Sequence, residues 1–261
     1  MSTSYPILSK SILDNYYAKF ANRMMNELTR EAALKGLTMV ALNGLHHEAD
    51  APVIPISNPD QFLPAFFDLL KKQQRSLHLN TLECLEALTR RYKSQLSSKA
   101  QEIQNEICAM ISDQDLQKAN VALKIATNLI EANSDASAHR STIAKAIDAS
   151  SSEVITGSVK ETIKNFFKVA AKAEMLEQGE VQMLLASVDL KKQCAAACVA
   201  ICLAHSSKFQ GTLDQLWMMI GSQDPKQLVV SALTIGEYGK IKDLSGEQRI
   251  LPTVQLLFSN P

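Results

Sequence analysis

The sequence is poor in glycine and in aromatic residues. It has nine glycines among 261 residues, and Phe, Trp and Tyr together make up 5% of the chain. β-Sandwiches and dinucleotide-binding sheets normally contain more of both, whereas the abundant Ala, Leu, Lys, Glu, Gln and Ile favour helices. These shortages predict an all-α protein.

An excess of charge and a long apolar run are also missing. Lys and Arg number 27 and are balanced by 27 Asp and Glu, so no basic field would attract a phosphate backbone. No apolar stretch approaches the length that crosses a bilayer, and the N-terminus lacks the charged and apolar regions of a secretory signal. We therefore expect no nucleic-acid or membrane partner, and a cytoplasmic and nuclear location.

Motifs of catalysis are absent as well. The sequence contains no G-x-S-x-G, phosphate-binding loop, H-E-x-x-H or G-x-G-x-x-G pattern, and no pair of carboxylates is set apart as an acid/base couple. We expect a protein that is not an enzyme and that has no cofactor, metal or small-molecule substrate. The alternative, a helical enzyme, predicts ionisable residues that converge in a buried pocket.

The cysteines allow two interpretations. Cys194, Cys198 and Cys202 lie four residues apart on one helical face and spread over about 12 Å, too far for one metal ion. We expect them to pack as small buried hydrophobes, with a redox or metal role as the alternative. The adjacent His46 and His47 point in different directions, which favours a solvated helix end over a metal site.

Helix-sized segments repeat along the chain and alternate with short breaks. When the apolar stripes of every second segment are superposed, the aligned positions are separated by 48, 40, 38, 36 and 34 residues. The aligned residues are Leu37, Leu85, Ile125, Ile163, Val199 and Leu233. This period, with two helices per unit, is typical of HEAT or armadillo arrays, and a loop insertion at 46–58 lengthens the first step.

Two prolines occupy equivalent places in the repeat. Pro64 and Pro252 both follow a leucine in an apolar segment and are 188 residues apart, or five units of just under 40. We interpret them as kinks inside first helices. The sequence thus predicts a right-handed HEAT-repeat α-solenoid over residues 1–261, with about six helical hairpins and an unpaired terminal helix. An apolar last helix predicts a segment of a longer array, or an end covered by another chain.

Basic residues of the predicted second helices are candidates for contact with an acidic protein partner. In helical arrays of this kind the second helices line the concave face, where partners usually bind. The candidates are Arg75, Arg90, Arg91, Lys118, Lys160, Lys191 and Lys226. The alternative is that basic pairs such as Arg90 and Arg91 complement helix C-termini or form a solvated rim.

Two stretches resemble a known family. "LVVSALTIGEYGKIKDLSG" (228–246) and "FLPAFFDLLKKQQRSLHLNTLECLEALTRRY" (62–92) are similar to segments of the cullin-associated, neddylation-dissociated proteins, in the same order and at a fitting separation. These are HEAT-repeat regulators of cullin–RING ubiquitin ligases. The resemblance extends loosely over most of the chain and places it in the central-to-late part of a much longer protein.

The resemblance implies a non-enzymatic scaffold. Proteins of this family wrap around an unneddylated cullin and its RING subunit and promote exchange of the substrate receptor. Their central repeats form an arch, so this segment either contacts the cullin or sets the curvature of the array. The alternative function is another HEAT-repeat adaptor, of the nuclear transport receptor or phosphatase scaffold type.

Overall fold

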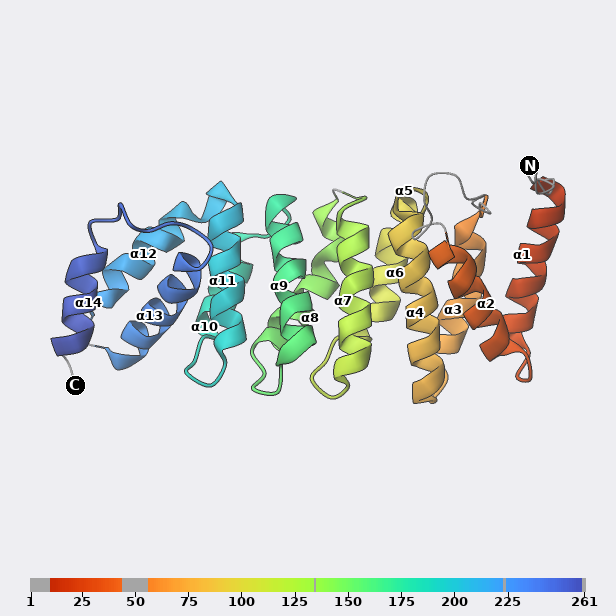
Figure 1. The fold of residues 1–261 in the computed structure, drawn as a ribbon, viewed down its shortest axis with the longest axis horizontal. Helices are drawn as coiled ribbons and strands as arrows, with labels where there is room; N and C mark the ends of the chain where they lie inside the picture. Colours follow the sequence, from red (N-terminus) through yellow and green to blue (C-terminus); the bar gives the residue numbers. More distant parts are fainter. Residues whose placement is uncertain (1–9, 44–55, 134, 223, 260–261) are drawn as a thin grey trace, which may run out of the picture.

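The chain forms a single row of helical hairpins. The computed structural model describes residues 10–43, 56–133, 135–222 and 224–259, and these residues contain helices and turns but no strand. The hairpins follow one another along one axis, with α1 and α14 at opposite ends (Figure 1). An all-α solenoid of six hairpins followed by one more helix is confirmed for these residues. Most of the predicted insertion at 46–58, including His46 and His47, lies outside them.

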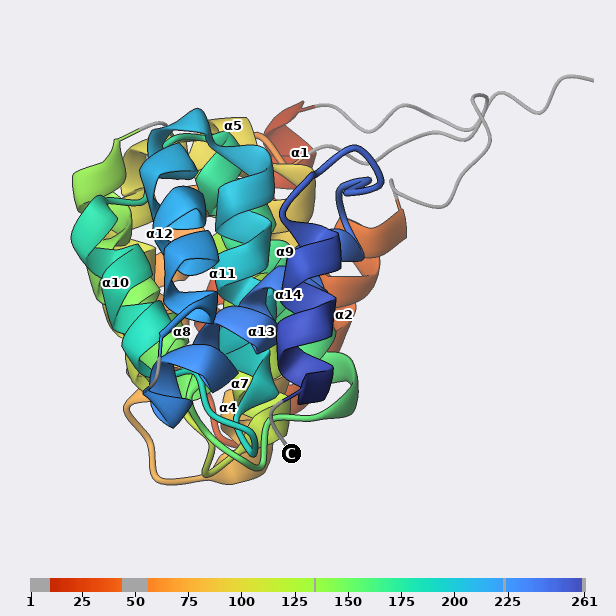
Figure 2. The same ribbon diagram turned by 90° about the vertical axis from the view of Figure 1, so that its left-hand side faces the viewer.

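The helices lie in two layers (Figure 2). The first helix of each hairpin lies in the first layer, which consists of α1 (Lys10–Met25), α3 (Leu63–Leu70), α6 (Ala100–Ile107), α8 (Arg140–Ser150), α10 (Gln178–Ala186) and α12 (Gln210–Ile220). The second layer consists of α2 (Arg30–Asn43), α4 (Arg75–Arg91), α7 (Leu116–Ile130), α9 (Gly157–Lys172), α11 (Gln193–His205) and α13 (Pro225–Gly239). A short α5 (Lys93–Leu96) precedes α6, and α14 (Ile250–Ser259) follows the last hairpin. Among the described residues, none of these helices is long and apolar enough to span a bilayer.

The apolar register predicted for the second layer is confirmed in five of its six helices. Leu37, Leu85, Ile125, Ile163 and Val199 are all 0% exposed, and each lies where its helix meets the neighbouring helices. Leu233 is only partly buried. On α13 the buried positions are Val230, Ser231, Thr234, Ile235 and Tyr238, so the buried face is shifted by one residue from the prediction.

The helix α11 is buried on all sides. Every residue from Cys194 to Leu203 is buried, because α9 and α13 flank it in the second layer while α8, α10 and α12 cover it from the first. Cys194, Cys198 and Cys202 are at most 3% exposed. They pack as small buried hydrophobes, as expected, and burial raises the pKa of the Cys198 and Cys202 thiols.

Several ion pairs join residues of neighbouring elements at about the spacing of the repeat. Three ion pairs link residues 38 to 40 positions apart, with nitrogen–oxygen distances of 2.6 to 2.7 Å. They are Arg75–Asp115, Lys93–Glu131 and Arg140–Glu180. The repeat found in the sequence is therefore also the period of the contacts.

The prolines do not kink their helices. Pro64 lies in the first turn of α3, directly after a 3₁₀ turn at Pro59–Phe62, and Pro252 is the third residue of α14. The backbone nitrogens of a first turn have no acceptor inside the helix, so proline removes no hydrogen bond there. The predicted interior kinks are thus wrong, although both prolines do belong to the helix that follows a second-layer helix.

Candidate protein-binding groove

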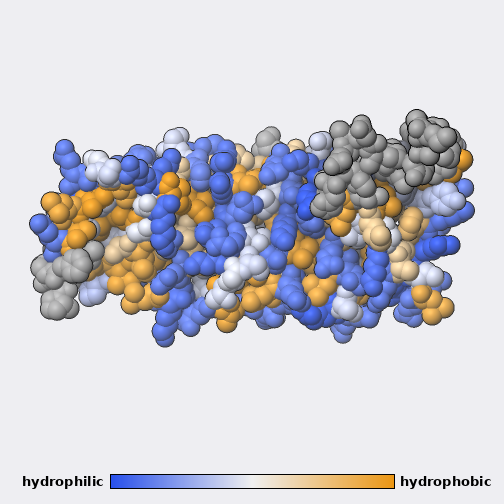
Figure 3. Space-filling model, viewed as in Figure 1, coloured by the Kyte–Doolittle hydropathy of each residue, from blue (hydrophilic) through white to orange (hydrophobic). Residues whose placement is uncertain are grey.

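Three hollows lie along the second layer. The first is about 760 Å³ and is lined by α2, α4 and α7. The second, about 260 Å³, lies over α4, α7 and α9, and the third, about 270 Å³, lies over α9, α11 and the turn after α13. Glu86 and Lys124 line both the first and the second, and Glu161 and Asn165 line both the second and the third. We call this connected surface the groove. The same face of the molecule is shown in Figure 3, where bands of hydrophilic residues alternate with apolar ones.

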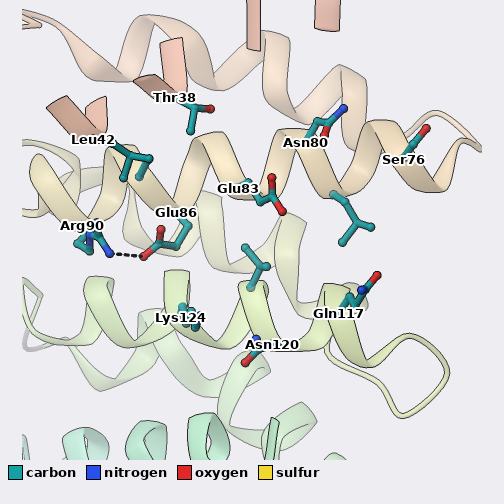
Figure 4. Close-up of a pocket in the computed structure, with 13 residues that line it drawn as sticks. Thr38, Leu42, Ser76, Asn80, Glu83, Glu86, Arg90, Gln117, Asn120 and Lys124 are labelled. Carbon is teal, nitrogen blue, oxygen red and sulfur yellow. Dashed lines mark ion pairs between the residues drawn. The ribbon is translucent and has the colours of Figure 1, made fainter. Parts of the chain in front are cut away.

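The first hollow is built from polar stripes of neighbouring helices. On α4 the lining includes Ser76, Asn80, Glu83 and Arg90, which recur at helical spacing on one side of the helix. Figure 4 shows α4 crossing the hollow, with Thr38 and Leu42 of α2 on one side and Gln117, Asn120 and Lys124 of α7 on the other. The buried stripe of each helix faces the core, so the opposite polar stripe is left for the groove.

Charges in the first hollow are balanced but only partly paired. Glu86 lies 4.0 Å from Arg90 one turn further along α4. Glu83 and Lys124 make no ion pair with any residue that the structure describes. A surface with unpaired charges of both signs can recognise a polar protein surface by complementary ion pairs.

Hydrogen bonds between helices hold the floor of the second hollow. Thr162 of α9 donates to Asn120 of α7 at 2.6 Å, and Asn128 of α7 donates to Thr89 of α4 at 3.3 Å. These bonds join α4, α7 and α9, so the polar stripes are presented by packed helices rather than by loops.

The third hollow is positively charged. Lys164 and Lys168 of α9 line it together with Ile201 and His205 of α11, and Lys242 lies close by. Burial lowers the pKa of His205, and the positive charges of Lys168, Lys172 and Lys242 lower it further. His205 is therefore largely neutral at pH 7, while the lysines around it carry the charge.

The seven basic residues proposed from the sequence do not lie together. Five lie at or just before the first turn of a second-layer helix: Arg75, Lys118, Lys160, Lys191 and Lys226. The turns that lead into α7, α9 and α11 share one long edge of the solenoid, the lower edge in Figure 1. Arg90 and Arg91 end α4 at the opposite edge, and Arg90 alone of the seven lines the groove.

Four of the seven are engaged within the chain. Arg90 pairs with Glu86 at 4.0 Å and Lys118 with Asp115 at 3.7 Å, each within a few residues of its partner. Arg75 binds Asp115 at 2.6 Å and Gln117 at 2.7 Å, and this contact holds the pKa of Asp115 below its usual value. Arg91 donates to the carbonyl of Val40 at 2.7 Å and to that of Ala41 at 3.3 Å, near the C-terminal end of α2. Arg75 and Arg91 link successive hairpins, which is a structural role.

Several groove residues were not among the binding residues proposed from the sequence. They are Glu83, Glu86, Asn120, Lys124, Lys164, Lys168 and His205. The signal that could have found them is a polar stripe opposite the buried stripe of each second helix. Metal chemistry gains no support from the described part of the chain, in which no three His, Cys, Asp or Glu are placed to hold an ion.

Comparison with known proteins gives several relatives that share a name. No family model matches the chain. Cullin-associated NEDD8-dissociated protein 1 of Arabidopsis thaliana is 25% identical in a match that covers 92% of this chain and 21% of the relative. The Drosophila melanogaster protein of the same name is 23% identical in a match that covers 90% of this chain and 21% of the relative.

A shorter match is closer in sequence. Cullin-associated NEDD8-dissociated protein 2 of Mus musculus is 32% identical over 111 residues, which cover 42% of this chain and 8% of the relative. A solved structure of an engineered protein superposes with a TM-score of 0.48 at 11% identity, over 85% of this chain and 96% of that one. The resemblance seen in the sequence is confirmed by the named relatives, and the chain spans about a fifth of the length of those that it matches almost throughout.

Proposed function

Because the chain is a relative of the cullin-associated NEDD8-dissociated proteins, we propose that it is a non-enzymatic scaffold segment that binds a cullin. In the finer form of this proposal, it engages an unneddylated cullin with its RING subunit and promotes exchange of the substrate receptor. The observation that carries the proposal is the match of relatives with this name along 92% of the chain.

The groove supports the same proposal. It is long and open, it joins three hollows of about 760, 260 and 270 Å³, and polar and charged side chains such as Glu83 and Lys124 line it beside apolar ones such as Val121. Such a surface suits an extended protein contact, whereas small-molecule sites are deeper and enclosed. We propose that the second layer faces the cullin, and that this takes place in the cytoplasm and nucleus.

A pull-down tests the proposal. The immobilised chain is incubated with an unneddylated cullin–RING pair and, in parallel, with the same pair after neddylation. We expect retention of the unneddylated pair only. Absence of retention from both samples would overturn the cullin proposal, and equal retention would overturn its dependence on neddylation.

A matched pair of variants tests the groove. Lys124→Trp places a large side chain in the first hollow, while Lys145→Trp makes the same change at an exposed lysine of α8 in the first layer. We expect the first to weaken retention about tenfold, because the added ring blocks contact at the centre of the interface. The second should leave retention unchanged, and equal effects would mean that the cullin does not lie in the groove.

A further inference from the structure

The helix α9 carries a row of lysines. Lys160, Lys164, Lys168 and Lys172 are separated by four residues each, so they lie on one side of the helix at intervals of about 6 Å. We call them the lysine row. The opposite side of α9 is held in the core by Val159, Ile163, Phe166, Phe167, Ala170 and Ala171.

Little within the chain neutralises this row. Lys164 pairs with Glu161 at 2.9 Å, and within the described residues the other three lysines form no ion pair. The neighbouring helix α11 contains no Asp or Glu from Gln193 to His205. Like charges four residues apart destabilise a helix, so the row costs stability unless an anion lies against it.

The row leads into the third hollow. Lys164 and Lys168 line this hollow with Ile201 and Ile241, and Ile241 is 39% exposed. The charged and titratable groups around His205 are Glu161, Lys164, Lys168, Lys172 and Lys242, of which only Glu161 is acidic. Excess positive charge thus surrounds a small apolar floor.

We propose that the lysine row is a docking strip for an acidic α-helix of a protein partner, with Asp or Glu at four-residue intervals facing the lysines. An apolar side chain of that helix would sit in the third hollow against Ile201 and Ile241. The inference rests on the proposed function for the assumption that the chain binds a protein. It adds the chemistry that the partner presents and the part of the groove that receives it.

The spacing of the row favours a helix over a nucleic acid. Carboxylates four residues apart on a helix repeat at about 6 Å, which matches the interval between the lysines. A single-stranded nucleic acid would instead require aromatic side chains for base stacking, and Phe, Tyr and Trp are absent from the lining of the third hollow as described. The chain as a whole also has no net charge.

Synthetic peptides test the inference. One labelled helical peptide carries Glu at four positions spaced by four residues with Leu beside them, and its partner peptide carries Gln at the same four positions. Fluorescence anisotropy measures their binding to the intact chain. We expect the Glu peptide to bind, with an affinity that falls as salt rises, and the Gln peptide to bind at least tenfold more weakly.

Two double variants locate the site. Lys168→Gln with Lys172→Gln removes two charges of the row and should weaken the Glu peptide about tenfold. Lys71→Gln with Lys72→Gln removes the same charge from the exposed turn before α4 and should change binding less than about twofold. Circular dichroism of both variants verifies that they fold.

Three results would overturn the inference. The Glu peptide could fail to bind, or both double variants could weaken it equally, which would mean that any lysine pair suffices. An oligodeoxythymidine that competes as well as the Glu peptide would identify a general polyanion surface. If the chain retains the cullin–RING pair but not the Glu peptide, only this inference fails; the reverse result removes the cullin proposal and leaves the docking strip.

Discussion

Ile163 allows the packing between hairpins to be measured at one residue. It is 0% exposed at the middle of α9, which packs against α7 and α11 in the second layer. Leu233 occupies the equivalent repeat position on α13 but is only partly buried. The substitutions Ile163→Ala and Leu233→Ala each remove three carbon atoms, so burial is the main difference between them.

The expected magnitudes follow from the burial. Removing three buried carbons costs about 2.4 kcal/mol of transfer free energy at about 0.8 kcal/mol each, and the cavity between three helices raises the total for Ile163→Ala to about 3–4 kcal/mol. For Leu233→Ala we expect about 1–1.5 kcal/mol, because part of the side chain is already in contact with water. A loss of 3–4 kcal/mol is a large part of the stability of an ordinary domain.

Urea unfolding followed by circular dichroism gives the free energy of unfolding of each variant. Amide hydrogen exchange should show faster exchange in α7, α9 and α11 of Ile163→Ala and unchanged exchange in α2, because hairpins couple mainly to their neighbours. If Leu233→Ala costs as much as Ile163→Ala, burial does not set the cost at these positions, and if α2 is loosened equally, the hairpins do not couple mainly to their neighbours.

Two further predictions concern buried groups. Cys108 is the one partly exposed thiol in the described chain, so we expect a thiol reagent to modify it rapidly in the native protein. The reagent should reach the buried thiols only after unfolding, namely those of Cys84, Cys194, Cys198 and Cys202. Fast modification of more than one thiol in the native protein would contradict this burial. His139 is 0% exposed and contacts the Gln104 amide, and burial lowers its pKa from the usual 6.5. Below pH 6.5 the folded state therefore binds fewer protons than the unfolded chain, and the free energy of unfolding should fall as the pH drops. Urea unfolding at about pH 7 and about pH 5 should show this loss, and an equal loss in His139→Gln would assign it to other groups.

The order and pairing of the helices could be predicted because apolar periodicity is a local signal. Five superposed positions, including Leu85 and Ile125, are fully buried at the predicted places. On α13 the predicted core position was wrong by one residue, because Thr234 is fully buried there and the predicted Leu233 is only partly buried. The Thr234 hydroxyl donates to the carbonyl of Val230 at 2.7 Å, so a polar residue can occupy a core position that a hydrophobicity pattern assigns to its neighbour.

The charged site could be predicted only in part, because ion pairing across hairpins is not visible in the sequence. Arg75 and Arg91 carry the charge that contact with an acidic partner requires. Their side chains instead bond to residues of this chain that lie 40 and 51 positions away, Asp115 and Val40. Lys160 was chosen for its place on a second helix, while Lys164, Lys168 and Lys172 of the same row were not. The four-residue spacing was present in the sequence, and the structure adds that nothing described on α11 neutralises it.

The ion pairs between successive hairpins have a mechanical consequence. Each extensive helix–helix contact lies within one hairpin or between two consecutive ones, as in the Arg140–Glu180 link. Under tension along its axis, such an array should lengthen in discrete steps of one hairpin, since breaking one junction leaves the others intact. A force–extension trace with one large step in place of several would show that the hairpins yield as a single block.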